Sequence, residues 1–216
     1  MTNDTLILLS GGLDSTVLLA HTLQHGPAVA LSVNYGQRHH RELAAAQAVA
    51  HHYRVDHHVL DFTSWGRLLV GSSLTDPTVD VPHVDYDADS MAATVVPNRN
   101  AAFLMAAAGI AQALGHDTVA TAVHAGDHAI YPDCRPEFIH AANRAALAGT
   151  GGAVQIVAPF VDRTKAEIAH LGRTLGVPFA LTWSCYEGGA QHCGACGTCR
   201  ERRQALHGFD PTTYTT

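Results

Sequence analysis

Short apolar segments alternate with segments of helical spacing along most of the chain. The apolar runs cover residues 5–9, 28–33, 57–60, 117–123 and 154–157, and the helical segments cover residues 14–25, 38–52, 100–114, 137–147 and 164–175. Neighbouring parallel strands need a long crossover connection, usually a helix, so this alternation predicts parallel βαβ units. We therefore expect an α/β fold with a doubly wound parallel sheet and helices on both of its faces.

The loops after the expected strands are where a ligand should bind, because open α/β sheets bind ligands beyond the carboxyl ends of their strands. Residues 10–15, 34–38 and 124–135 would lie at that edge. Residues 62–96 have weak periodicity and several Pro and Asp residues, so we expect an irregular loop over the site.

The composition changes near Trp183, just before four of the five cysteines. We expect a nucleotide- and substrate-binding α/β domain over residues 1–182. A small metal-bound appendage would follow over residues 183–216, with a last short helix near residues 200–206.

Charge and hydropathy exclude several classes of protein. The 216 residues are 47% hydrophobic and carry a net charge of -6, which permits a sizeable core and argues against a broad nucleic-acid-binding face. The N-terminus lacks the basic region of a signal peptide, and the longest apolar stretch, residues 101–114, is too short to span a membrane. We expect a cytoplasmic protein, in which clustered cysteines bind metal rather than form disulfides.

The loop between the first expected strand and helix has the sequence Ser10-Gly11-Gly12-Leu13-Asp14-Ser15. Its glycines let backbone amides approach an anion, the helix N-terminus adds partial positive charge, and the serines can donate hydrogen bonds. The loop has neither the Walker A spacing nor the dinucleotide-binding glycine spacing. The sequence indicates a phosphate site here, and a plain glycine turn before a helix is the alternative.

Four cysteines are close together near the end of the chain. They are Cys185, Cys193, Cys196 and Cys199, in the pattern C-x7-C-x2-C-x2-C. Four thiolates at such spacing are typical of a closed structural zinc site, whereas an iron–sulfur cluster of the ferredoxin type would continue with a further cysteine. We expect one scaffolding zinc per chain, with nearby arginines offsetting its negative charge. The paired histidines at 39–40, 51–52 and 57–58 have no metal-site spacing, and we expect them at the surface.

The chain has a single lysine, Lys165, beside 12 arginines. It lies at the start of the helix after the last expected strand, for which Thr164 is the expected N-cap. This is a ligand-facing end of the sheet. A compact ammonium on a flexible stem suits a moving phosphate charge better than a planar guanidinium does. An exposed first-turn lysine is the alternative.

The Ser-Gly-Gly-Leu-Asp-Ser string resembles the pyrophosphate loop of the ATP pyrophosphatases, which cleave ATP between its α and β phosphates. Further strings narrow the resemblance. They are Tyr35-Gly36-Gln37-Arg38-His39, Val96-Pro97-Asn98-Arg99-Asn100, Tyr131-Pro132-Asp133-Cys134-Arg135-Pro136-Glu137-Phe138 and Thr182-Trp183-Ser184-Cys185-Tyr186. Together they are similar to the 7-cyano-7-deazaguanine synthase family over about residues 5–207.

That resemblance implies a Rossmann-like, adenine nucleotide alpha hydrolase-like fold and an ATP-dependent carbon–nitrogen ligase. It implies that ATP adenylates 7-carboxy-7-deazaguanine, that ammonia forms an amide, and that a second activation dehydrates the amide to a nitrile. No glutaminase domain is evident, so we expect free ammonia as the nitrogen source. The resemblance also implies a homodimer, with small molecules rather than nucleic acid as direct partners.

Residue roles follow from the matched strings and from chemical type. Lys165, Asp14 and Arg99 are the expected catalytic residues, with Asp14 helping to hold Mg²⁺ on ATP. The expected ATP-binding residues are Leu9, Ser10, Gly11, Gly12, Leu13, Asp14, Ser15, Thr16 and Lys165. The expected substrate-binding residues are Tyr35, Gln37, Arg38, Arg99, Asn100, Asp127, Tyr131, Asp133, Arg135 and Glu137. Asp127, Asp133 and Glu137 are the candidates for reading the base, and Asp133, in the tyrosine-proline-aspartate string, is the favoured one.

Other functions remain possible at this stage. A relative could stop at the amide or transfer the activated deazaguanine to a macromolecule. A tRNA-modifying pyrophosphate-loop ligase would need a basic surface, against which the net charge of -6 argues. A non-catalytic zinc-binding module would not need the intact phosphate loop. No role is evident for His83, Asp85, Asp87 and Asp89 in the middle segment.

Overall fold

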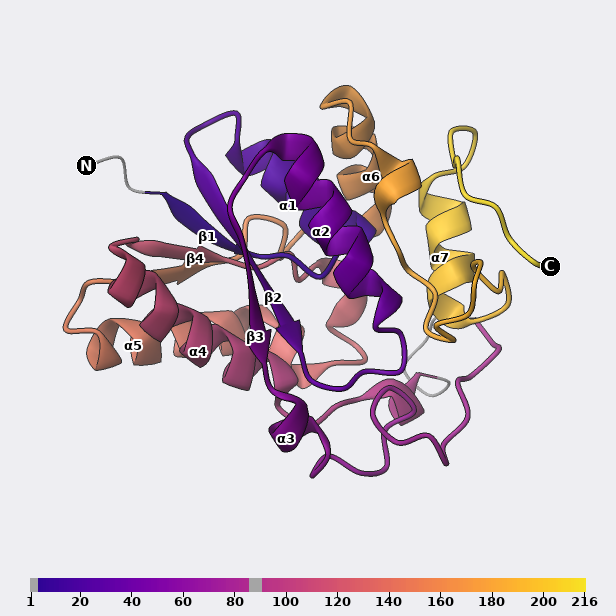
Figure 1. The fold of residues 1–216 in the computed structure, drawn as a ribbon, viewed down its shortest axis with the longest axis horizontal. Coiled ribbons are helices and arrows are strands. Elements are labelled where there is room, and N and C mark those ends of the chain that lie inside the picture. The colour runs from indigo at the N-terminus through magenta and orange to yellow at the C-terminus, as the bar shows by residue number, and fades with distance from the viewer. Residues whose placement is uncertain (1–3, 86–90) are drawn as a thin grey trace.

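A five-stranded parallel sheet forms the centre of the molecule (Figure 1). The structure is a computed structural model that describes residues 4–85 and 91–216. The strands are β1 (Thr5–Leu8), β2 (Ala28–Asn34), β3 (His57–Asp61), β4 (Thr118–Ala120) and β5 (Gln155–Val157). All neighbouring pairs are parallel, in the order β3-β2-β1-β4-β5, which confirms the predicted doubly wound sheet.

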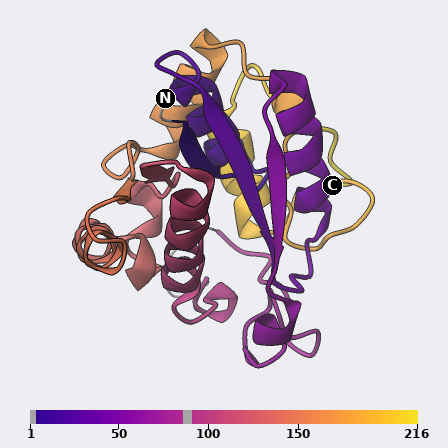
Figure 2. The same ribbon diagram turned by 60° about the vertical axis from the view of Figure 1, so that its left-hand side comes forward.

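Helices cover both faces of the sheet, as predicted. They are α1 (Leu13–Thr22), α2 (Arg41–Tyr53), α3 (Thr63–Gly66), α4 (Arg99–Leu114), α5 (Pro136–Gly149), α6 (Lys165–Thr174) and α7 (Gly197–Ala205). Figures 1 and 2 show α1 and α2 on one side of the strands and α4 and α5 on the other. The fold is thus a three-layered α/β arrangement.

Successive residues of the strands build two separate cores. Ile7 and Ala120 pack in the cluster that contains residues of α1, α2 and α6. Leu6 and Val119, one residue earlier in each strand, pack against α4 and α5. Side chains alternate between the faces of a strand, so a sheet covered on both faces needs continuous apolar runs. Most of the strands could be predicted from the sequence because they are such continuous apolar runs.

The chain runs from β1 outward to β3 and then returns to place β4 on the other side of β1. The strand order reverses between β1 and β4, and such a switch point is where open α/β sheets bind ligands. The loop from Leu9 to Gly12 follows β1, and the segment from Thr121 to Asp127 follows β4. The fold therefore brings the predicted phosphate loop and the predicted base-reading loop together.

Several element boundaries differ from the prediction. The strand predicted over residues 117–123 ends at Ala120, because its neighbour β5 already ends at Val157. The helix predicted from residue 38 begins at Arg41, after a turn at residues 38–40 in which the Arg38 N–H donates to the carbonyl of Leu74. Residues 62–96 are largely irregular, as predicted, apart from α3 and a 3₁₀ turn at Ala92–Thr94. Asp87 and Asp89 lie outside the described residues.

The helix predicted over residues 164–175 has the predicted N-cap. The Thr164 Oγ1 accepts a hydrogen bond from the Glu167 N–H, and the Glu167 carboxylate accepts from the Thr164 N–H at 2.7 Å. This reciprocal capping box fixes the first turn of α6 and so the starting point of the Lys165 side chain.

Arg202 of α7 is fully buried and ties the C-terminal segment to the body. Its guanidinium donates to the Phe179 carbonyl at 2.8 Å and to the hydroxyls of Thr182 and Thr212 at 2.7 and 2.8 Å. Asp210 lies 3.7 Å from Nε. Its hydrogen bonds go to these partners, and its charge also acts on Cys199 of the four-cysteine cluster.

We predict that Arg202→Ala lowers the free energy of unfolding by about 3–5 kcal/mol, because it leaves several buried acceptors without a donor. Arg144→Ala, at an exposed position of α5, is the matched control and should change it by less than about 0.5 kcal/mol. Urea unfolding at pH 7 measures both. Equal losses for the two variants would contradict the tethering role of Arg202.

Candidate active site

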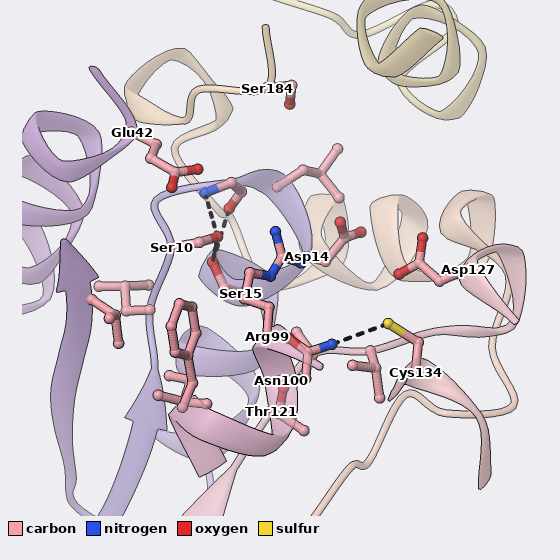
Figure 3. Close-up of a pocket in the computed structure, with 18 of the residues that line it drawn as sticks. Ser10, Asp14, Ser15, Glu42, Arg99, Asn100, Thr121, Asp127, Cys134 and Ser184 are labelled. Carbon is pink, nitrogen blue, oxygen red and sulfur yellow. Dashed lines mark hydrogen bonds between the residues drawn. The ribbon is translucent and has the colours of Figure 1, made fainter. Parts of the chain in front are cut away.

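A pocket lies at the carboxyl edge of the sheet, at the switch point (Figure 3). Its wall is built from the loop after β1, the first turns of α1, α4 and α6, the start of α2 and the segment after β4. Trp183, Ser184, Tyr186 and Thr198 of the C-terminal segment complete it. The site therefore lies between the α/β body and the four-cysteine segment.

The phosphate loop is held by its own serines. The Gly12 N–H donates to Ser10 Oγ at 3.2 Å, and the Ser10 and Ser15 hydroxyls are 3.1 Å apart. Gly11 has φ +85°, and a Cβ there would meet the backbone carbonyl oxygen of Glu42, so the loop packs directly on α2. Within the described chain, no side chain caps α1. Its first N–H groups point towards the pocket end and are available to an anion.

Lys165 lies between two carboxylates. Its Nζ is 3.1 Å from Oδ2 of Asp14 and 2.8 Å from Oε2 of Glu201. Burial alone would lower the pKa of Lys165, but the two carboxylates raise that pKa above its usual value. Burial likewise opposes ionisation of Asp14, yet Lys165 and His124 hold its pKa below the usual range. Lys165 and Asp14 are therefore both charged at neutral pH.

His124 connects Asp14 with the loop after β4. Its Nδ1 accepts a hydrogen bond from the Gly126 N–H at 3.1 Å, which fixes the orientation of the ring. Its Nε2 lies 3.9 Å from Asp14 Oδ2 and 3.6 Å from Asp127 Oδ2. The ring is buried and directs Nε2 towards both carboxylates.

Arg99 and Asn100 enter the pocket from the first turn of α4. Arg99 Nη1 donates to Tyr35 Oη at 3.4 Å, and its guanidinium lies 6.0 Å from the centre of that ring. Asp133 accepts a hydrogen bond from the Asn100 N–H at 2.8 Å, while the Asn100 side chain donates to Cys134 Sγ at 3.2 Å. Asp133 thus orients the start of α4 rather than facing the pocket.

Glu42, near the start of α2, contributes a largely buried carboxyl to the pocket wall. Its Oε1 accepts from the Gln37 amide at 2.9 Å, and Oε2 lies 3.4 Å from His39 Nε2. Burial raises the pKa of Glu42 to about 7, although the Gln37 hydrogen bond and the charge of Arg99 act in the opposite direction. Figure 3 shows this carboxyl beside the phosphate loop.

Most of the residues expected to bind ligands line this one pocket. They are Leu9, Ser10, Gly12, Leu13, Asp14, Ser15, Tyr35, Arg99, Asn100, Asp127, Tyr131 and Lys165. They come from positions 9 to 165 of the chain, and the sheet topology brings them together. Their individual roles remain predictions.

Seven other expected residues lie outside the pocket lining, and most have structural contacts instead. Gly11 packs on α2, and Thr16 donates to the Gly12 carbonyl. Gln37 holds Glu42, Asp133 caps α4, and Arg135 donates to the carbonyl of His128. Arg38 donates to the carbonyls of Asp76 and Val79, so its guanidinium is directed to the middle segment and not to the site. Glu137 is exposed in the first turn of α5.

The sequence interpretation missed several residues of the pocket. They are His39, Glu42, Leu43, Phe103, Thr121, His124 and Thr198. The surface position expected for His39 is wrong, because Tyr186 covers its ring at a centroid distance of 5.1 Å. No local pattern marks these residues, since each becomes part of the site through contacts with distant segments.

The four cysteines form a compact cluster. Their sulfur atoms all lie within 4.8 Å of one another, and Cys193 Sγ is 3.9 Å from Cys199 Sγ. Tetrahedral ligands at a Zn–S distance of about 2.3 Å are separated by about 3.8 Å, so the set fits a structural zinc ion. With four protein ligands the ion would have no position open for water.

Two residues of the middle segment bind the four-cysteine segment at the surface. His83 Nε2 is 2.7 Å from Glu187, and Arg200 donates to Asp85 at 2.8 Å. Val81 packs with three of the cysteines. His83 and Asp85, to which the sequence gave no role, therefore have a structural one. Arg200 donates to Asp85 and to the Ala195 carbonyl rather than to the sulfur atoms.

The fold belongs to the class of doubly wound α/β proteins with a parallel sheet. NMN synthetase from Francisella tularensis shares the fold with a TM-score of 0.54 at 19% identity, over 88% of this chain and 69% of that one. A predicted subunit of tRNA methyltransferase from Methanocaldococcus jannaschii aligns with a TM-score of 0.50 at 13% identity, over 79% of this chain and 75% of that one. These similarities concern the fold alone.

Sequence comparison then places the chain within a family. The family described as "Queuosine biosynthesis protein QueC" matches residues 4–210. Proteins named 7-cyano-7-deazaguanine synthase from Paracoccus denitrificans and Rhizobium meliloti are 51% and 52% identical, over 97% of this chain and 92% and 91% of theirs. The chain belongs to the QueC family, which confirms the resemblance stated from its motifs.

None of the helices in residues 4–85 and 91–216 is long and apolar enough to cross a membrane.

We predict that Glu42→Gln stabilises the fold at high pH. The pKa of this carboxyl is about 4.5 in the unfolded chain and about 7 in the folded one. Its ionisation therefore destabilises the fold increasingly from pH 4.5 to pH 7 and by a constant amount above that. The variant's free energy of unfolding, relative to that of the original chain, should be about 2 kcal/mol higher at pH 8 than at pH 5. Urea unfolding measures the difference, with Glu137→Gln on an exposed glutamate as control. A gain that does not depend on pH would contradict the burial argument.

We predict a colourless protein with about one zinc ion per chain. Cys196→Ser should reduce the metal content to near zero, because three thiolates no longer close the tetrahedron. Cys134→Ser, at a buried cysteine outside the cluster, is the control and should retain the metal. Elemental analysis and absorption spectra decide the point, and a brown protein containing iron would overturn the assignment.

Proposed function

We propose that this chain is a 7-cyano-7-deazaguanine synthase, an ATP-dependent ligase that converts 7-carboxy-7-deazaguanine and ammonia to the nitrile. The observation that carries the proposal is the match to the QueC family over residues 4–210, with relatives of that name at about half identity. The pocket supports it, because a phosphate loop, a buried lysine and an arginine face one cavity at the switch point of the sheet.

The phosphate end of ATP would bind at the N-terminus of α1. Ser10, Gly12 and Ser15 supply donors there, and Lys165 supplies a positive charge. Attack of the substrate carboxylate on the α-phosphate releases pyrophosphate and forms an acyl adenylate. Both products carry negative charge, and preorganised amides and an ammonium stabilise it without reorganising.

Asp14 is the residue that we assign to Mg²⁺. Its Oδ2 contacts Lys165, whereas its Oδ1 is buried without a hydrogen-bond partner among the described residues. A carboxylate oxygen is the ligand type that Mg²⁺ prefers, and the ion would neutralise phosphate charge.

The deazaguanine would lie between the first turn of α4 and the loop after β4. Arg99 is placed to bind the substrate carboxylate, and Tyr35 and Tyr131 offer aromatic faces and hydroxyls. Among the three carboxylates considered, Asp127 lines the pocket, whereas Asp133 caps α4 and Glu137 is exposed. We therefore assign recognition of the base's N–H groups to Asp127.

Ammonia attacks the acyl adenylate, and AMP leaves to give the amide. The amide oxygen then attacks the α-phosphate of a second ATP and expels pyrophosphate. The adenylated amide loses AMP and two protons to give the nitrile. Both steps use one anionic leaving group at one phosphate site, which is why a single pocket suffices. The zinc ion has a scaffolding role in this scheme.

We further propose a cytoplasmic homodimer that acts on small molecules and does not bind nucleic acid. The net charge of -6 supports the last point. We also retain the division into an α/β domain of residues 1–182 and a metal-bound segment of residues 183–216, although Leu206 of the latter packs in the core of α1 and α6.

The test is incubation of the protein with 7-carboxy-7-deazaguanine, ammonium and Mg-ATP, followed by mass analysis. We expect the amide as an intermediate, the nitrile as product and two AMP per nitrile. Asp14→Asn should slow turnover by about 100-fold or more. Asp56→Asn, at the start of β3 on the opposite edge of the sheet, is the matched control.

Absence of any product from the unmodified protein would refute the proposal. Formation of the amide without the nitrile would identify an enzyme that stops early.

A further inference from the structure

Glu201 reaches the active site from the four-cysteine segment. It lies on α7, two residues after Cys199, and its Oε2 is 2.8 Å from the Nζ of Lys165. The side chains of Glu201 and Lys165 are each only 14% exposed. The sequence interpretation assigned Glu201 no role.

We propose that Glu201 is a positioning residue for Lys165, and that the four-cysteine segment serves catalysis by holding Glu201 in place. The proposal rests on the proposed function, in which Lys165 binds the phosphates of ATP. It gives the metal cluster a task at the active site beyond scaffolding of the fold.

The ammonium of Lys165 has three N–H groups. Asp14 lies in one direction at 3.1 Å and Glu201 in another at 2.8 Å, so two donors are directed and the third remains for a phosphate oxygen. A lysine side chain has four rotatable bonds, and a single hydrogen-bond partner does not fix the position of its ammonium. Two carboxylates from different helices define the position of Nζ.

The position of Glu201 depends on what holds α7. Cys196 is the N-cap of α7, and the Cys199 and Arg200 N–H groups both donate to its carbonyl, at 3.0 and 3.1 Å. One residue after Glu201, the buried Arg202 binds the body of the protein. Glu201 therefore lies between a metal-ligand anchor and a buried guanidinium anchor.

The local charges predict the kinetic effect of removing the Glu201 carboxylate. Asp14, Asp127 and His124 are the other titratable groups around Lys165, and the first two are acidic. Loss of one negative charge would not weaken the attraction of the site for ATP. Misplacement of the ammonium should instead slow the chemical step, so kcat falls while KM for Mg-ATP does not rise.

The single lysine of the chain provides a direct probe. Protein labelled with ¹⁵N only in the lysine side chain has one ammonium, that of Lys165, which can be observed by NMR. An ammonium held by two partly buried carboxylates should give a sharp signal in slow exchange with water. In Glu201→Gln we expect this signal to shift and broaden.

Glu187→Gln is the matched control. This glutamate belongs to the same segment but pairs with His83 at the surface, so its replacement should leave the lysine signal and the kinetics unchanged. Glu201→Asp keeps the charge on a shorter side chain and should retain part of both properties. Zinc content and thermal unfolding establish that each variant is folded.

In the adenylation assay we expect kcat of Glu201→Gln to fall by about 10- to 100-fold, with KM for Mg-ATP unchanged within about twofold. An unaltered lysine signal, or an altered signal with unchanged kcat, would overturn the proposal. If the unmodified protein makes no product, the proposed function fails on its own, and the NMR comparison still decides whether Glu201 holds Lys165.

Discussion

The ammonium of Lys165, held between the carboxylates of Asp14 and Glu201, joins three parts of the chain. Asp14 follows the phosphate loop, Lys165 begins α6, and Glu201 belongs to the four-cysteine segment. A buried lysine without partners would lose its proton, so the two carboxylates are what make a positive charge possible at this place. The same contacts set the distance between the phosphate loop and α7, and so define one wall of the pocket.

The pocket depends equally on the reversal of strand order. Because β1 and β4 are neighbours, the phosphate loop after β1 meets His124 and Asp127 after β4. The four-cysteine segment then closes the site with Trp183 and Thr198. Its role is therefore to complete a cavity that the sheet alone leaves open, and the buried Arg202 keeps it in place.

Much of the fold was predictable, because each strand is a continuous apolar run buried on both faces. The N-cap of α6 at Thr164, the parallel sheet and the compact cysteine cluster were all confirmed. Helix starts were less accurate where a distant segment intervenes, as at Arg38. The site residues that lie in recognisable motifs, such as Ser10 and Arg99, were predicted. Glu201 and His124 lie in no such motif and were missed.

The sequence by itself determined the sheet, the serine-glycine loop after β1, the four-cysteine cluster and the family. These depend on local spacing: apolar runs, glycines beside serines, and cysteines three residues apart. Only the tertiary structure decided which charged groups face one another. Asp14 and Glu201 are far apart along the chain, and nothing in their local sequence encodes their shared contact with Lys165. That contact arises from packing of α1, α6 and α7, which brings three ordinary charged residues into one buried cluster.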